Sequence, residues 1–253
     1  MLENKSTLFE YLLYLGDTSL ILSHRLSEWC GHGPILEQDI ALTNITLDIL
    51  GQARFWYQLA AEESAAGLDE DQIAYFRESN EFRNLLLVEQ PNVDWGQTVL
   101  RQYMYDCFIT TYLQALTHSS DSKIAEIALR SVHESQYHYR WSGDWLLRLG
   151  AGTPKSKTIM QESLNQLWRF HQEPIVAASF EVEMAAQGIA PDLETIKTEY
   201  LDKLHTGISK AGLVVPDDGR LLAGGKQGVH TEHLGYILAE MQHVQRTYPG
   251  LEW

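Results

Sequence analysis

The sequence predicts an all-α protein, a four-helix bundle with additional helices. Apolar residues recur at steps of three and four along four long stretches, which is the period of an amphipathic helix. No stretch of five or more residues alternates convincingly between apolar and polar, so strands are not expected. The long stretches form two pairs separated by a long crossover, as in many four-helix bundles. We expect the long helices at about residues 7–29, 35–63, 95–117 and 122–149, and the added helices at 157–187, 192–210 and 232–246, all in a single domain of residues 1–253.

The first two helices differ in their apolar pattern. In the first, residues such as Leu8 and Leu12 follow alternating steps of four and three, which predicts a coiled-coil-like seam. The CGHGP stretch of residues 30–34 ends this helix because glycine and proline interrupt helices. In the second, apolar residues between Ile40 and Ala53 spread over more than half of the helix surface. A surface helix needs a narrower apolar stripe, so we expect the second helix to be buried on most sides.

A polar stripe runs through the apolar arc of the second helix. It consists of Glu37, Asn44, Asp48 and Gln52, at steps of seven, four and four. Burying a carboxylate costs several kcal/mol unless it is paired or bound to a cation. Asp48 is therefore expected to face either a metal ion or a fixed hydrogen-bond donor.

Turn and cap residues place the boundaries of the later helices. The third begins near Asp94 or Trp95, and the fourth runs from Ser122, a good N-cap, to a stop at Gly150. Two helices are expected within residues 157–187, at 157–171 and 174–187, with Pro174 at the start of the second. Asp192 caps the helix that follows it.

The net charge limits the possible partners. The chain holds 19 basic and 34 acidic residues, for a formal charge of −15. This charge argues against nucleic acid and anionic membranes, and favours solubility or a partner with a basic face. There is no run of about 18 apolar residues, and the N-terminus lacks the features of a signal peptide. Because Cys30 and Cys107 also fit a reducing compartment better than a disulfide scaffold, we expect a cytoplasmic protein.

A di-iron site in a four-helix bundle needs one carboxylate from each of two helices and a Glu-x-x-His motif from each of the other two. The second helix offers Asp48, but Gly51 stands three residues later, where a histidine would be required. The fourth helix offers Glu134, with Tyr137 at the required offset and His138 one residue later. Neither Glu-x-x-His motif is present.

The positively charged side chain of Arg130 could take the place of an iron ion beside Glu134. Arg130 precedes Glu134 by one helical turn, from where a guanidinium can neutralise the carboxylate and donate several hydrogen bonds. We therefore predict a metal-free polar cluster in a dry interior, and no catalytic, cofactor-binding or metal-ligating residue in this chain. The predicted cluster comprises Asp48, Asp106, Arg130, Glu134 and His138. A distorted metal site is the alternative left open.

The segment GGKQGVHTEHLG, residues 224–235, is the most unusual local string. His230, Glu232 and His233 are residue types that bind zinc, but no further ligand stands at a usual spacing. The glycines around Lys226 lack the pattern of a phosphate-binding loop. We interpret the segment as a structural turn into the last helix that can also form a contact surface.

Four strings, which together span much of the chain, resemble the C-subunit family of bacterial phenylacetyl-CoA epoxidases. They are residues 16–54 (beginning GDTSLILSHRLSEWCGHGP), FRNLLLVEQPN (82–92), ESQYHYRWSGDWLLRLG (134–150) and GGKQGVHTEHLGYILAEMQ (224–242). The resemblance implies a ferritin-like fold and a place in a multicomponent oxygenase of phenylacetate catabolism. It implies that the di-iron centre belongs to a homologous catalytic A subunit. It also implies a bridging B subunit and a reductase with FAD and an iron–sulfur centre.

From this resemblance we expect a structural subunit that docks on the homologous catalytic subunit and stabilises it, in a complex that epoxidises the ring of phenylacetyl-CoA. A homo-oligomer also remains open. The competing hypothesis is that the chain is itself a di-iron oxygenase with an unusual ligand set. That set would be Glu28, Asp48, Asp106, Glu134 and His138. A third possibility is a standalone helical bundle without an oxygenase partner.

Overall fold

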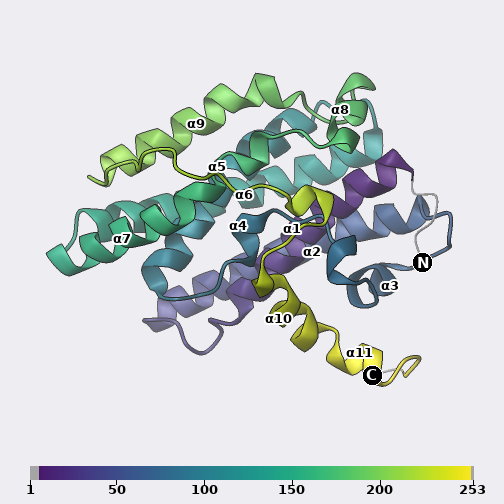
Figure 1. Ribbon diagram of the computed structural model, residues 1–253, viewed down its shortest axis with the longest axis horizontal. Helices are drawn as coiled ribbons and strands as arrows, with labels where there is room; N and C mark the ends of the chain where they lie inside the picture. Colours follow the sequence, from purple (N-terminus) through teal and green to yellow (C-terminus); the bar gives the residue numbers. More distant parts are fainter. Residues whose placement is uncertain (1–5, 252–253) are drawn as a thin grey trace. The chain divides into compact units, whose positions relative to one another are not determined.

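The computed structural model describes residues 6–251, which form helices and loops without a strand in that range (Figure 1). Residues 1–5 and 252–253, the ends of the predicted domain, lie outside the described residues. The all-α prediction is confirmed.

The chain divides into two compact units: the first holds the residues up to Pro91, Ala178–Met184 and those from Gly224 onward, and the second holds Asn92–Ala177 and Ala185–Ala223. That both belong to a single domain stays a prediction.

The first unit is built on two long helices that pack side by side, drawn in purple and blue in Figure 1. They are α1 (Thr7–Ser27) and α2 (Leu36–Glu62). The side chain of Ser6 caps α1 by accepting a hydrogen bond of 3.1 Å from Phe9 N. The shorter elements of the unit are α3 (Glu70–Tyr75), η1 (Ser79–Glu81), α4 (Leu86–Glu89), the start of α8 (Ser179–Ala186), η4 (Gly225–Gln227), α10 (Glu232–Met241) and α11 (His243–Thr247).

The burial of α2 differs from the expectation. Leu42, Ile45 and Ile49 are buried, but Ile40 is 53% exposed and Leu47 is 59% exposed. The prediction that this helix is buried on most sides is therefore wrong within this chain. The physical reason is that only one side of α2 is covered by α1 and the short elements of its own unit.

The second unit is centred on α5 (Trp95–Leu116), most of whose residues are buried. It is packed by α6 (Ser122–Gly150), α7 (Pro154–Leu167) and α9 (Leu193–Lys210). Asp94 caps α5 by accepting a hydrogen bond of 2.8 Å from Gln97 N. The cap of α6 is Asp121, so Ser122 is the first helical residue and not the N-cap.

The two helices predicted at residues 157–171 and 174–187 are both shorter than expected. After α7 the chain forms two 3-10 turns, η2 (Trp168–Phe170) and η3 (Glu173–Ile175), before α8 begins at Ser179. Pro174 thus lies in a 3-10 turn instead of starting a long helix. Proline fixes its own backbone angle and lacks a donor, which suits a short turn equally well.

Candidate functional site

Asp106 lies at the centre of the polar side chains that α5 and α6 bring together. It is fully buried and accepts a hydrogen bond of 2.8 Å from Gln102 Nε2 and one of 2.7 Å from Ser142 Oγ. Burial raises the pKa of Asp106 to about 7, although the charge of His138 and the two hydrogen bonds act against this. His138 is also buried on α6. The two neutral donors satisfy the buried carboxyl within the chain, as in a structural polar cluster.

Arg130 does not occupy the dry interior that the sequence predicts for it. Its Nη2 atom lies 2.6 Å from Glu126 Oε1, and the two side chains are 61% and 64% exposed. The prediction of a buried guanidinium is therefore wrong, because the stripe through Glu126 and Arg130 lies on the side of α6 that faces solvent in this chain. Glu134 is half-buried. An exposed pair four residues apart contributes about 0.3–0.5 kcal/mol, so the loss of Arg130 costs little.

The remaining predicted site residues are distributed over both units. Asp48 is half-buried on α2 of the first unit, whereas Asp106, Arg130, Glu134 and His138 belong to the second. That Asp48 joins the other four in one cluster stays a prediction. Glu28, a ligand in the competing hypothesis, forms an ion pair of 2.7 Å with Arg25. Within residues 6–251, no group of three or more His, Cys, Asp or Glu side chains is arranged to hold a metal ion.

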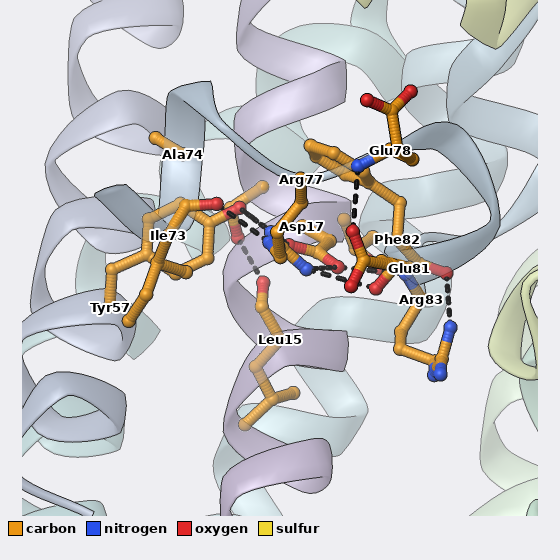
Figure 2. A network of polar contacts seen from close by, with 12 residues as sticks. Leu15, Asp17, Tyr57, Ile73, Ala74, Arg77, Glu78, Glu81, Phe82 and Arg83 are labelled. Atoms are coloured by element: carbon orange, nitrogen blue, oxygen red, sulfur yellow. Dashed lines mark hydrogen bonds and ion pairs between the residues drawn. The ribbon is translucent and has the colours of Figure 1, made fainter. Parts of the chain in front are cut away.

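The first unit holds a buried ion pair that the sequence analysis missed (Figure 2). Arg77, which follows α3, donates to both carboxylate oxygens of Asp17 on α1. The same carboxylate accepts hydrogen bonds from the Tyr57 hydroxyl at 2.5 Å and from Arg83 N at 2.7 Å. A Cβ atom on Gly16 would lie 2.5 Å from Tyr57 Cε1, so this glycine lets the tyrosine approach. The cluster joins α1, α2 and the segment after α3.

A second buried carboxylate anchors the C-terminal segment. Glu89 accepts hydrogen bonds from Thr231 N at 2.9 Å, from Thr231 Oγ1 at 2.6 Å and from Asn84 Nδ2 at 2.9 Å. His230 Nδ1 lies 2.5 Å from the same carboxylate. Gly228 adopts a left-handed conformation with φ of 78°, which favours glycine. The contacts of Glu89 support the interpretation of this segment as a structural turn.

Lys226 in the same segment is used within the fold. It is 2% exposed, and its Nζ atom lies 3.0 and 2.8 Å from the two carboxylate oxygens of Glu181, which is equally buried. Its ammonium also lies 4.9 Å from the centre of the Tyr14 ring. Lys226 is therefore the partner of a buried carboxylate and is not presented to a phosphate group.

The uncovered side of α2 carries a regular apolar row, which we call the α2 seam. The seam consists of Leu36, Ile40, Thr43, Leu47 and Leu50, at steps of four, three, four and three. This is the spacing of a coiled-coil interface, in which each apolar residue enters a gap on a facing helix. The four apolar members are 71%, 53%, 59% and 40% exposed in chain order. The described part of the first unit leaves Leu36, Ile40 and Leu47 more than half exposed. At its C-terminal end the seam adjoins α3, since Leu47 and Leu50 line a hollow of about 470 Å³ with α3 residues.

Gly51 lies beside the α2 seam in the interior of the helix. A glycine there costs about 1 kcal/mol relative to alanine. A Cβ atom at this position would have no neighbour within 4 Å, so packing among the described residues does not require glycine. A second helix that approaches α2 closely would account for it.

The whole chain, residues 1–253, matches the model of a family described as "Phenylacetic acid catabolic protein". It is also similar to the C subunit of 1,2-phenylacetyl-CoA epoxidase from Escherichia coli (strain K12). The two sequences are 46% identical over 243 residues, which cover 96% of this chain and 98% of the relative. None of the helices in residues 6–251 has the length and apolarity needed to span a membrane.

Proposed function

Because the chain belongs to the phenylacetic acid catabolic protein family, we propose that it is the structural C subunit of a phenylacetyl-CoA epoxidase. In this role it docks on the homologous catalytic subunit and stabilises it. The complex converts the ring of phenylacetyl-CoA to an epoxide, with di-iron held by the catalytic subunit. The bridging subunit connects the assembly, and a reductase with FAD and an iron–sulfur centre supplies electrons. We place the complex in the cytoplasm, where the two free cysteines would stay reduced.

The observation that carries this proposal is the α2 seam. Its four exposed aliphatic side chains follow a helix-pairing register, and an exposed apolar row of this kind marks an interaction surface. Ferritin-like subunits are made of long helices, so a homologous partner supplies the required helix face. If another chain packed against this side of α2, the helix would be buried on most sides, which is what its apolar pattern predicts.

The non-catalytic role is supported by the residues at the positions where a working di-iron site needs ligands. Gly51 and Tyr137 stand at the histidine offsets, and neither side chain can replace an imidazole there. We propose that Asp106 and His138, together with Asp48 and Glu134, are the remnant of an ancestral metal site. Gln102 and Ser142 now hold the Asp106 carboxyl with neutral hydrogen bonds.

Leu47→Lys is expected to prevent assembly with the catalytic subunit. Leu47 is 59% exposed, so the substitution changes the stability of the separate chain by no more than about 0.5 kcal/mol. In the complex it places an ammonium group in a dry helix interface. The affinity for the catalytic subunit should fall by roughly 30-fold or more, which corresponds to about 2 kcal/mol. Sedimentation velocity with the purified catalytic subunit measures this change.

Val182→Lys is a matched control, because Val182 is also 59% exposed in the first unit but lies on α8 and outside the seam. This variant should bind the catalytic subunit as the unmodified chain does. Equal binding by Leu47→Lys and the unmodified chain would refute the seam as the docking surface. Failure of the unmodified chain to bind the catalytic subunit at micromolar concentration would refute the structural role itself.

A further inference from the structure

A hollow of about 710 Å³ lies in the first unit, between α3 and the C-terminal residues. Its apolar wall includes Phe76, Tyr248 and Leu251, which are 37%, 55% and 57% exposed. Such a volume accommodates one or two large side chains, and aromatic surface of this kind is enriched at protein interfaces. These three side chains stay partly exposed among the described residues.

The rim of this hollow is acidic. Asp69, Asp71 and Glu81 contribute three carboxylates, and the only basic residue among the lining residues is Arg77. Arg77 is 3% exposed and already donates to Asp17, so its charge is not presented to a ligand. The pKa of Tyr75 is raised by its partial burial and by the negative charge of Asp71. The second effect is consistent with a negative electrostatic potential at the rim. An anion such as a phosphate or a CoA ester is therefore unsuited to this site.

From this combination of apolar wall and acidic rim, we propose that the hollow docks a segment of another protein of the epoxidase complex. The segment carries an apolar anchor residue flanked by lysine or arginine. The anchor fills the hollow against Phe76 and Tyr248, and the basic residues face Asp71 and its neighbours. The chain's charge of −15 adds long-range attraction for a basic partner. This proposal rests on the proposed function for the identity of the complex. The hollow adjoins the α2 seam, because Asp71 and Tyr75 also line a neighbouring hollow with Leu47 and Leu50.

Photocrosslinking tests the proposal. The photoreactive residue p-benzoylphenylalanine replaces Phe76, and the labelled chain is mixed with the purified catalytic subunit, the bridging subunit and the reductase, first singly and then together. Crosslinks are expected to map to one segment that contains lysine or arginine. Their yield should fall between about 50 and 300 mM NaCl, since salt screens the attraction. Asp71→Lys in the labelled chain should lower the apparent affinity by roughly tenfold.

Asp217→Lys is the matched control, because Asp217 is an exposed carboxylate of the second unit and not part of the rim. It should leave the crosslinks unchanged. Three results would overturn the proposal: no crosslink to any component, crosslinks to a segment without basic residues, or equal yields from Asp71→Lys and Asp217→Lys. If the chain binds the catalytic subunit but position 76 gives no crosslink, this inference fails while the proposed function stands. If the chain binds none of the components, both fail.

Discussion

Arg77→Ala is expected to lower the free energy of unfolding by about 3–5 kcal/mol, the cost of leaving a buried charge without its partner. The Asp17 carboxylate is fully buried and the Arg77 side chain is only 4% exposed, so water cannot replace the guanidinium. Burial favours the neutral form of Arg77, but the charge and hydrogen bond of Asp17, together with the charges of Tyr57 and Glu81, outweigh this effect and raise the pKa of the guanidinium. The remaining donors, Tyr57 and Arg83 N, are neutral groups and do not compensate the charge.

Urea denaturation followed by tryptophan fluorescence measures this loss of stability. Arg54→Ala is the matched control, because Arg54 also pairs with a carboxylate, Glu70 at 3.0 Å, but is 66% exposed. This control should cost less than about 1 kcal/mol. Combining Arg77→Met with Asp17→Asn removes both charges and should recover more than half of the loss. If Arg77→Ala and Arg54→Ala have similar effects, the Asp17 cluster does not stabilise the first unit.

Lys226→Ala is expected to have an effect of similar size, about 3–5 kcal/mol. Glu181 would keep one hydrogen bond, from Ala178 N at 2.8 Å, and lose the only ion pair that the structure gives it in the described residues. The substitution also removes the ammonium from the Tyr14 ring. Because Lys226 holds the C-terminal segment to α8, amide hydrogen exchange should increase around residues 224–231.

Lys197→Ala provides the comparison for Lys226→Ala. Lys197 pairs with Glu194 at 3.4 Å, and the two side chains are 43% and 74% exposed. Its loss should change the free energy of unfolding by less than about 0.5 kcal/mol. The double variant Lys226→Met and Glu181→Gln should be more stable than Lys226→Ala alone. A denaturation midpoint for Lys226→Ala equal to that of Lys197→Ala would contradict the account of this pair.

The fold class could be predicted from the sequence because it depends on periodicity. Steps of three and four identify the long helices within a few residues of where they begin and end. The sequence predicts a break between helices at about residues 172–173, but it does not predict that the chain on both sides of this break forms 3-10 turns. Residues 168–170 and 173–175 form these 3-10 turns, and local propensity does not distinguish such turns from an α-helix.

The candidate site was harder to predict, since burial depends on which surfaces meet. The helical pattern of α6 does not reveal that Arg130 faces solvent. An arginine one turn before Glu134 is compatible both with a buried ion pair and with an exposed one. The buried pairs of Arg77 with Asp17 and of Lys226 with Glu181 connect residues 60 and 45 positions apart. The local signal of such a pair is a charged residue beside apolar ones, as with Glu181 between Phe180 and Val182. The α2 seam is the opposite case. Its apolar row is typical of a buried helix, but its side chains are exposed in the separate chain.

The central claim is that this chain supports the reaction without carrying it out. Its most direct test measures iron content and phenylacetyl-CoA turnover for the chain and the catalytic subunit, each purified separately and loaded with ferrous iron, and then for their mixture, with the reductase supplied throughout. We predict that the chain alone binds no stoichiometric iron and gives no epoxide, and that adding it to the catalytic subunit restores or increases turnover. Two irons per chain, together with epoxide formation in the absence of the catalytic subunit, would contradict the claim.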